Sequence, residues 1–303
     1  MRLLEKNVIK LKLEEDQIKF HSHILGLDIG QSLSKIVFTE NDELVLSIVN
    51  TDIGIEEIDK YINSSKKSIN KINFTGGRAF NLFLQYKDTF ESVLINEFEA
   101  NINGLNFLHL FQKKKVLPPS IVVTIGTGTS MVLKKAKFEH IGGSALGGGF
   151  FMGITRLLYE ITDYQEAVKL ANTGNRYNID LKVADIYDKL DPRVDLIFRE
   201  FTAASLGKIN TELELNNFKK EDILSAINAA IAENVGTIAI SLADHNDIPN
   251  IVFCGGYLIN NKAFKQILSL LCKIKNKKAI FLNYSEYAGA LGALISNRLS
   301  IEC

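Results

Sequence analysis

Residues 25–38 read LGLDIGQSLSKIVF, and this stretch decides how the rest of the chain is interpreted. The apolar run Ile24–Asp28 is typical of a buried strand, and it ends on an acid. Gly30 lets the backbone turn, Ser32 offers a hydroxyl and an N–H group inside the turn, and Lys35 stands before a second apolar run. The stretch therefore predicts two strands joined by a tight polar turn.

Two interpretations of this hairpin stay open. An Asp-Ile-Gly turn between strands is, taken alone, more often an ordinary hairpin. The same arrangement resembles the phosphate-binding hairpin of nucleotide kinases of the actin/hexokinase/Hsp70 type. In that class the acid holds Mg²⁺, usually through water, while turn N–H groups and a cation face phosphate oxygens. Support from elsewhere in the chain is needed to choose between them.

The composition is that of an ordinary soluble protein of about two domains. The chain has 303 residues, and its 35 basic residues balance its 35 acidic ones, which favours neither nucleic acid nor an anionic membrane as a partner. No apolar run approaches the roughly twenty residues of a membrane span, and the N-terminal segment is too charged for a signal peptide. Three scattered cysteines form no metal-ligand pattern and suit a reducing compartment. We therefore expect a cytoplasmic protein.

Apolar runs of strand and helix type alternate along the chain, which predicts an α/β sheet covered by helices. Val8–Leu13 partly alternates and suits either an edge strand or a tail. We expect further strands at Glu43–Val49, Ile72–Thr75, Val93–Ile95, Ile121–Ile125, Met131–Leu133, Ile251–Cys254 and Ala279–Leu282. We expect helices at Ile55–Ile62, Ala100–Phe111, Phe150–Glu160, Glu221–Asp244, Phe264–Leu271 and Tyr287–Leu294.

The strand–turn–strand pattern occurs twice in the chain. The Lys run and Pro118-Pro119 of Lys113–Ser120 predict a domain boundary, which divides the chain into residues 1–118 and 119–303. Directly afterwards an apolar strand leads into the turn Gly126–Ser130 and a second strand. Two strand–turn–strand units, one in each half, predict a duplicated architecture with a nucleotide in the cleft between the halves.

Three further stretches bear on function or packing. The glycine-rich segment Ile141–Gly149 runs into a predicted helix and would present N–H groups and the positive end of the helix dipole to an anion, although a flexible surface loop is the alternative. Glu97 follows a strand at the mouth of a helix, where it could be a general base or a helix-capping acid. The small residues of Phe201–Gly207 suit close packing.

The ordered set of motifs resembles the type II pantothenate kinases over nearly everything from Ile24 to the C-terminus. The motifs are DIGQSLSK at 28–35, TGG at 75–77, NEFEA at 96–100, GTGTS at 126–130, GGSALGGG at 142–149, ITDY at 161–164, NIDLKVADIY at 178–187, FTAASLG at 201–207, FCGGYLINN at 253–261 and YAGALGAL at 287–294. Each motif is ordinary by itself, whereas the set in this order is highly specific.

The resemblance implies a fold, an activity and a set of site residues. The fold would be α/β, of the actin/hexokinase/Hsp70 (ASKHA) type, with duplicated ribonuclease-H-like domains. The activity would be ATP- and Mg²⁺-dependent phosphorylation of the 4′-hydroxyl of pantothenate, the first step of coenzyme A synthesis, with Glu97 as the catalytic base. Positions implied to contact the nucleotide are Asp28, which would also hold the metal, Gly30, Gln31, Ser32, Lys35, Thr127, Gly147, Gly148, Gly149, Tyr164, Gly256 and Tyr257. Positions implied to contact pantothenate are Glu97, Thr127, Ser130, His140 and Ala204.

The resemblance also concerns assembly and regulation. Members of the family are homodimers, and the long helix Glu221–Asp244 is the segment we expect at that interface. Feedback by coenzyme A or its thioesters is a further implication.

Two departures from the family pattern bear on substrate and rate. Gln31 stands where relatives usually carry a second glycine, and His140 stands where they carry an arginine that helps to hold the substrate. Arginine is a permanent bidentate donor, whereas histidine is mostly neutral near pH 7. Two alternatives therefore stay open: a kinase of another small hydroxylated substrate, and a nucleotide-binding pseudokinase. The retention of Asp28, Lys35 and Glu97 argues against the pseudokinase, and His140 argues for it.

Overall fold

The computed structural model describes residues 8–12, 23–64, 69–195, 199–209 and 218–296, and within them two large sheets form the frame. The first sheet has the order β1-β4-β3-β2-β5-β6 and the second β13-β12-β7-β8-β9. The first contains β1 (Val8–Lys12), β2 (Ile24–Ile29), β3 (Leu33–Glu40), β4 (Glu43–Asn50), β5 (Lys71–Thr75) and β6 (Glu91–Leu94). The second contains β7 (Ser120–Ile125), β8 (Thr129–Lys134), β9 (Phe138–Ser144), β12 (Asn250–Cys254) and β13 (Lys278–Phe281).

The two sheets share one topology. In the first, β2, β3 and β4 form an antiparallel meander, and β5 and β6 continue the sheet parallel to β2 on its other side. In the second, β7, β8 and β9 form the same meander, and β12 and β13 continue it parallel to β7. The turn after β2 therefore corresponds to the turn after β7. This confirms the predicted α/β class and the predicted duplication.

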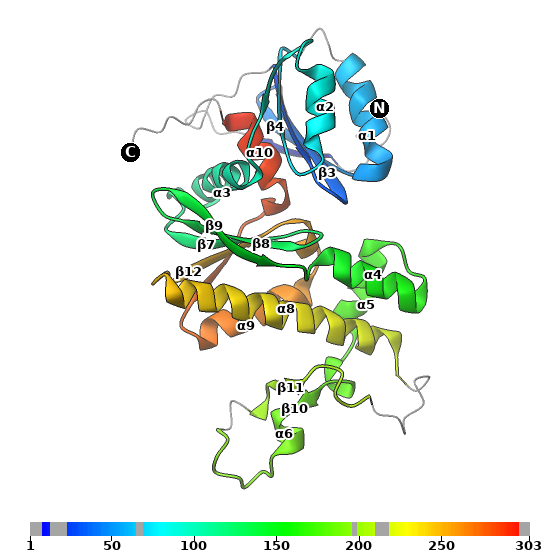
Figure 1. The fold of residues 1–303 in the computed structure, drawn as a ribbon, viewed down its shortest axis with the longest axis vertical. Helices are drawn as coiled ribbons and strands as arrows, with labels where there is room; N and C mark the ends of the chain where they lie inside the picture. The colour runs from blue at the N-terminus through cyan, green and yellow to red at the C-terminus, as the bar shows by residue number, and fades with distance from the viewer. Residues whose placement is uncertain (1–7, 13–22, 65–68, 196–198, 210–217, 297–303) are drawn as a thin grey trace.

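Helices cover the outer faces of both sheets, and one pair fills the space between them (Figure 1). Helices α1 (Thr51–Ser64) and α2 (Ala79–Tyr86) cover the first sheet, and α8 (Lys220–His245) and α9 (Lys262–Ile274) cover the second. Helices α3 (Glu97–Lys113) and α10 (Ala288–Ile295) lie between the sheets. The remaining elements are α4 (Gly148–Tyr159), α5 (Tyr164–Thr173), α6 (Val183–Ile186), the 3₁₀ turns η1 (Arg176–Asn178), η3 (Gly256–Leu258) and η4 (Ser285–Tyr287), and the short strands β10 (Leu181–Lys182) and β11 (Thr202–Ala204).

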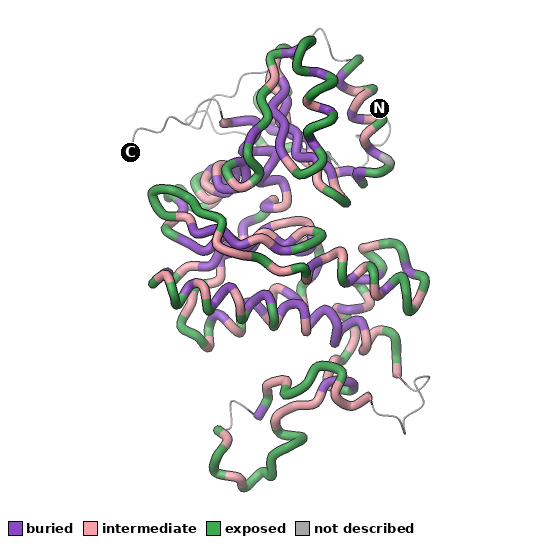
Figure 2. The backbone as a smooth tube through the Cα atoms, viewed as in Figure 1, coloured by how far each residue is buried: buried purple, intermediate pink, exposed green. Residues whose placement is uncertain are grey.

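The core between the sheets is held together by α3 and α10. Leu105 of α3 and Leu291 of α10 are fully buried, and they belong to one apolar cluster with Leu46 of the first sheet and Val252 of the second. Figure 2 shows buried residues in the strands of both sheets and in the helices between them. The division proposed at residue 118 therefore leaves α10, from the second part of the chain, packed against the first.

Glycines allow α3, α10 and β2 to touch backbone to backbone. A Cβ atom on Gly292 would lie 1.7 Å from the carbonyl oxygen of Ala100, and one on Gly104 would lie 1.9 Å from that of Ala288. Such distances are far below van der Waals contact, so only glycine fits at these positions. The small residues of YAGALGAL (287–294) are thus explained by the packing of α10 against α3.

Several expectations need correction. Residues 138–144, interpreted partly as a glycine loop, form strand β9, and only the part after Ser144 connects to α4. Helix α2 was not anticipated. The stretch Phe201–Gly207 is not closely packed, because most of it is exposed around β11. The possible N-terminal edge strand exists as β1, paired with β4, whereas residues 1–7 and 13–22 lie outside the described residues.

Helix α8 is long and apolar enough to cross a membrane, yet 67% of its most apolar window is buried inside the protein. It therefore has the character of a core helix, and it extends the predicted helix by one residue at each end.

The α3–α10 contact gives a prediction about stability. Gly292→Val should destabilise the protein by about 1–3 kcal/mol or more, because the new side chain must push α10 away from α3. Gly153→Ala is the matched control, since a Cβ on Gly153 of α4 meets nothing within 4 Å and should stabilise by about 0.4–1 kcal/mol. Urea unfolding followed by circular dichroism measures both, and a Gly292→Val protein as stable as the native one would contradict this packing.

Candidate active site

The carboxylate of Asp28 is held in a narrow space at the end of β2. Asp28 and Lys35 are cross-strand partners in the β2–β3 hairpin, and Lys35 Nζ lies 3.0 Å from Asp28 Oδ2. The carboxylate also touches two glycines: a Cβ on Gly76 would be 2.5 Å from Oδ1, and one on Gly289 would be 2.9 Å from Oδ2. Asp28 is therefore a buried acid. Lys35 balances its charge on one side, and the backbones of Gly76 and Gly289 lie close to it on two others.

The turns of the two halves are in direct contact. Ser32 lies in the turn after β2, Thr127 lies in the turn after β7, and their hydroxyl oxygens are 2.9 Å apart. Both residues are exposed, so this hydrogen bond spans an open surface rather than a packed core. The duplicated turns thus face one another, as the repeat in the sequence predicts.

Glu97 is the first residue of α3, but it does not cap that helix. Asn96 is the N-cap, because its side chain accepts hydrogen bonds from the N–H groups of Phe98 and Glu99. The interpretation of Glu97 as a capping acid is therefore wrong. Instead its side chain lines a pocket of about 350 Å³ between the ends of β5 and β6, together with Gly76 and residues 94–96.

The surroundings of Glu97 change its acidity. Although the side chain remains accessible from the pocket, the cleft walls remove part of its hydration, and this desolvation raises the pKa of Glu97 above its usual range. The carboxylate of Asp28 raises this pKa further, whereas the ammonium group of Lys35 lowers it. The site therefore contains two carboxylates of different character, one paired with lysine and one holding its proton to higher pH.

The glycines before α4 pack against the turn after β7. The N–H groups of Gly148 and Gly149 donate to the carbonyl oxygens of Gly126 and Thr127 at 2.8 and 2.9 Å. A Cβ on Gly147 would lie 2.8 Å from the same Thr127 oxygen. The expectation that these N–H groups are presented to an anion needs correction, because two of them are already used inside the protein. The glycines fix the position of Thr127.

His140 lies beside the start of α3. It is exposed on β9, and its ring stacks on the ring of Phe98, with centroids 4.7 Å apart and an interplanar angle of 12°. Phe98 directly follows Glu97, so the imidazole borders the region of the carboxylate. Ser130 of β8 pairs with Gly143 of β9, three residues after His140.

Comparison with known proteins now defines the family. Residues 50–296 match the family model described as Fumble. This chain belongs to the Fumble family. A protein named type II pantothenate kinase from Bacillus thuringiensis subsp. konkukian is 32% identical over 275 residues, covering 89% of this chain and 96% of the relative. A protein of the same name from Staphylococcus saprophyticus is 31% identical over 271 residues, covering 89% and 98%.

Solved structures support the fold of this Fumble-family chain. The activator of 2-hydroxyisocaproyl-CoA dehydratase from Clostridium difficile, with bound ADPNP, has a TM-score of 0.60 and 20% identity over 90% of this chain and 93% of that one. A ROK-family glucokinase from Streptomyces griseus, in complex with glucose and AMPPNP, has a TM-score of 0.53 and 13% identity over 89% and 97%. These similarities confirm the duplicated ASKHA-type α/β fold.

Tyr164 and Tyr257 belong to the scaffold of the Fumble-family site. The hydroxyl of Tyr164 donates to the carbonyl oxygen of Tyr257 at 2.7 Å, and the hydroxyl of Tyr257 donates to Asn228 Oδ1 at 2.7 Å. Tyr257 is 2% exposed, and burial raises the pKa of both phenols. A ligand at this position would meet the backbone around Gly256, which contacts Leu33 of the first hairpin, and not the phenol of Tyr257.

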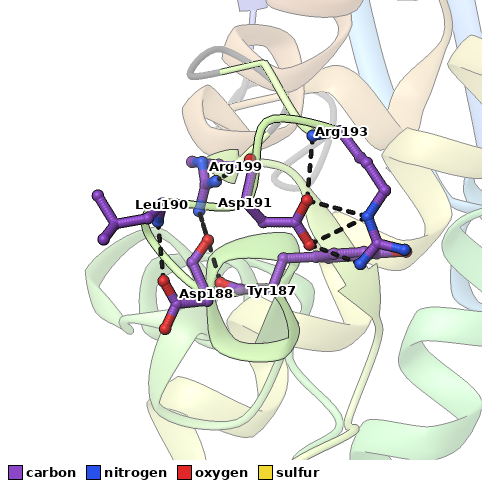
Figure 3. A network of polar contacts seen from close by, with 6 residues as sticks. All are labelled: Tyr187, Asp188, Leu190, Asp191, Arg193 and Arg199. Atoms are coloured by element: carbon purple, nitrogen blue, oxygen red, sulfur yellow. Dashed lines mark hydrogen bonds and ion pairs between the residues drawn. The ribbon is translucent and has the colours of Figure 1, made fainter.

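Ala204 lies away from the other site residues of its own chain. It belongs to an arm, the described residues 175–195 and 199–209, that lies beyond α8 on the side opposite to α3 (Figure 1). Buried Arg199 organises the tip of this arm by donating to the carbonyl oxygens of Asp188 and Asp191 at 2.7 and 2.9 Å, and Arg193 pairs with the Asp191 side chain (Figure 3). The geometry of one chain therefore does not bring Ala204 to Glu97.

Sequence reasoning missed residues that complete the site. Gly76 and Gly289, which enclose Asp28, appear in motifs that were quoted without a role. Asn96 and Phe98 stand on either side of Glu97, and an Asn directly before an acidic helical turn is a recognisable N-cap signal. The stacking partner of His140 had no signal, because Phe98 and His140 are far apart in the sequence.

The electrostatics of the site give a second prediction. Asp28→Asn should lower the pKa of Glu97, because it removes a nearby negative charge, whereas Lys35→Met should raise it. NMR titration of the Glu97 carboxyl carbon measures this pKa in each variant. Asp52→Asn, which removes an exposed acid paired with Arg78, is the control and should leave the pKa of Glu97 unchanged. If the pKa of Glu97 were unchanged in both Asp28→Asn and Lys35→Met, the three groups would not form one site.

Proposed function

We propose that this chain is an ATP-dependent pantothenate kinase that transfers the γ-phosphoryl group to the 4′-hydroxyl of pantothenate, the first step of coenzyme A synthesis. Membership of the Fumble family and relatives named type II pantothenate kinase along most of the chain support this activity. The observation that carries it is the contact between Ser32 and Thr127, because it joins the duplicated turns beside Asp28 and Glu97. Phosphates and a hydroxyl acceptor would meet at this point.

The proposed mechanism divides the work among the polar groups of the cleft. Phosphoryl transfer requires little covalent chemistry from the protein, so positioning and charge stabilisation dominate. Ser32 and Thr127 would donate hydrogen bonds to phosphate oxygens, and Lys35 would balance their charge. Glu97 would accept the proton of the attacking hydroxyl as that oxygen bonds to the γ-phosphorus and the bond from phosphorus to the ADP oxygen breaks. A raised pKa makes Glu97 a better proton acceptor than an ordinary glutamate.

The donor set around Asp28 fits Mg²⁺. This ion binds few protein groups, keeps several waters and is shared with the phosphates of the substrate, so one carboxylate at the phosphate site is sufficient. Asp28 supplies such a carboxylate, and the glycines beside it, Gly76 and Gly289, carry no side chain that could compete for the ion. When bound, the ion would reduce the negative charge on the phosphates.

His140 is the proposed contact for the acid end of the substrate. Its ring stacks on that of Phe98, the residue directly after Glu97. A neutral imidazole offers one hydrogen bond, whereas the arginine of relatives offers two with full charge. We therefore infer a lower affinity for pantothenate than in arginine-bearing relatives.

The alternative activities have less support. A pseudokinase would not need the Asp28–Lys35 pair and a separate glutamate of raised pKa. A kinase acting on a different small alcohol differs from this proposal only in the substrate, which a substrate screen decides.

We also propose that the protein is cytoplasmic and forms a homodimer through α8. The outward side of this helix carries the exposed residues Asn234, Thr237 and Ser241, which suit a close polar contact. Because Ala204 lies beyond α8 in its own chain, a substrate contact by Ala204 would occur in the cleft of the second copy. Sedimentation that gives the mass of one chain at micromolar concentration would contradict the homodimer and, with it, the contact of Ala204 with the second copy. Feedback by coenzyme A or its thioesters stays a prediction.

The activity itself is tested by ADP release. The native protein should release ADP faster with pantothenate than with glucose or without an acceptor. Glu97→Gln should lower kcat by about 10²–10⁴-fold while ATP still binds, because the positioned base is lost. Glu99→Gln is the matched control, since Glu99 lies in the first turn of the same helix and is exposed. Full turnover by Glu97→Gln, or ADP release indifferent to pantothenate, would contradict the proposal.

A separate prediction concerns His140. His140→Arg should lower the KM for pantothenate by about ten- to a hundred-fold, the range expected for gaining a charge-assisted contact. Steady-state kinetics of the native protein and of His140→Arg measure this effect. A KM that does not respond to His140→Arg would remove His140 from the substrate site.

A further inference from the structure

The turn after β2 is tied from behind by two residues that the mechanism has not used. Thr51, which is fully buried at the start of α1, donates from its hydroxyl to the carbonyl oxygen of Gly30 at 2.9 Å. The N–H group of the same Thr51 donates to the carbonyl oxygen of Ser32 at 2.9 Å. Arg78, after β5, donates from its NH1 group to the carbonyl oxygen of Gln31 at 3.3 Å. All three consecutive carbonyl groups of the turn are therefore bound.

Two supporting contacts fix these donors. The Thr51 hydroxyl has one hydrogen, which goes to Gly30, so Ser34 must be the donor in the 3.0 Å contact between Ser34 Oγ and Thr51 Oγ1. The guanidinium of Arg78 is oriented by Asp52 at 2.8 Å. The backbone N–H group of Arg78 donates to the carbonyl oxygen of Ile29, which lies before the turn, at 3.0 Å. Thr51 and Asp52 are neighbours, so both donors belong to one side of the turn.

Peptide geometry then determines the other side of the turn. In a planar trans peptide the N–H group points opposite to the preceding C=O group. With the carbonyl groups of Gly30, Gln31 and Ser32 drawn toward Thr51 and Arg78, the N–H groups of residues 31, 32 and 33 point away from them. Within the described part of the chain, the N–H groups of Gln31 and Ser32 donate to no backbone carbonyl. The Ser32 hydroxyl contacts Thr127, so the side of the turn that carries these N–H groups is the side that faces the turn after β7.

We propose that Thr51 and Arg78 are positioning residues that hold the 30–32 turn with its carbonyl groups away from the cleft, so that its N–H groups form a concave site for the terminal phosphates of a nucleotide. Successive N–H groups directed to one point are a recognised anion-binding arrangement. The side chain of Gln31 does not disturb this, because only its backbone takes part. The inference rests on the proposed kinase function and adds to it the groups that shape the phosphate site.

The test measures nucleotide affinity by calorimetry, without an acceptor substrate. Thr51→Val keeps the shape of the side chain but removes its hydroxyl, and Arg78→Gln shortens the donor out of reach. Each should weaken ATP and ADP binding by about ten-fold, the effect of losing one hydrogen bond to a backbone group that must then reorient. Affinity for AMP, which lacks the terminal phosphates, should not change. Thr51→Ser retains the hydroxyl and should restore native affinity for ATP and ADP.

A control separates positioning from general damage. Arg156→Gln removes an exposed arginine from α4, and this variant should bind ATP like the native protein. Equal losses for AMP and ATP, or no loss in Thr51→Val and Arg78→Gln, would overturn the inference. A native protein that binds ATP but does not phosphorylate pantothenate would instead overturn only the proposed function.

Discussion

The backbone contact between α3 and α10 sets the spacing on which the site depends. Gly292 lies against Ala100, and Gly104 lies against Ala288, so the two helices approach more closely than side chains would allow. The same helix pair carries site groups: α3 begins at Glu97, and Gly289 of α10 touches the carboxylate of Asp28. The position of both acids is therefore a consequence of how the two sheets are joined.

The site combines an acid paired with a lysine and an acid of raised pKa. Lys35 is bound to Asp28, and its charge compensates that carboxylate. Among the described residues Glu97 has no ion pair with a lysine, and desolvation and the charge of Asp28 raise its pKa. Two carboxylates close together would repel each other if both were free, and Lys35 reduces that repulsion for one of them. This difference gives the two acids different chemical roles.

Much of the fold could be predicted because apolar periodicity and glycine turns act locally. The strands at β2, β4 and β7 and the long helix α8 follow from such patterns. Strand β9 was hidden because Gly142 and Gly143 suggest a loop, although the sheet accommodates Gly143 where a Cβ would lie 2.5 Å from the carbonyl oxygen of Thr129.

The site could be predicted only in part, for a related reason. Asp28 lies near the end of β2, and Ser32 and Thr127 lie in the turns after β2 and β7, so the duplicated pattern was enough to predict that they come together. The use of the Gly148 and Gly149 N–H groups within the protein, and the burial of Tyr257, depend on contacts between segments far apart in the sequence. Local patterns contain no information about such contacts.

A crystal structure with a non-hydrolysable ATP analogue, Mg²⁺ and pantothenate would show whether Ser32, Thr127 and Glu97 form the site of phosphoryl transfer. We expect the γ-phosphate between the hydroxyls of Ser32 and Thr127, with their mutual hydrogen bond replaced by bonds to phosphate oxygens. We expect the primary hydroxyl of pantothenate within about 3 Å of a Glu97 carboxylate oxygen. A phosphate bound elsewhere, with the Ser32–Thr127 contact unchanged, or a pantothenate hydroxyl remote from Glu97 would contradict the proposed site.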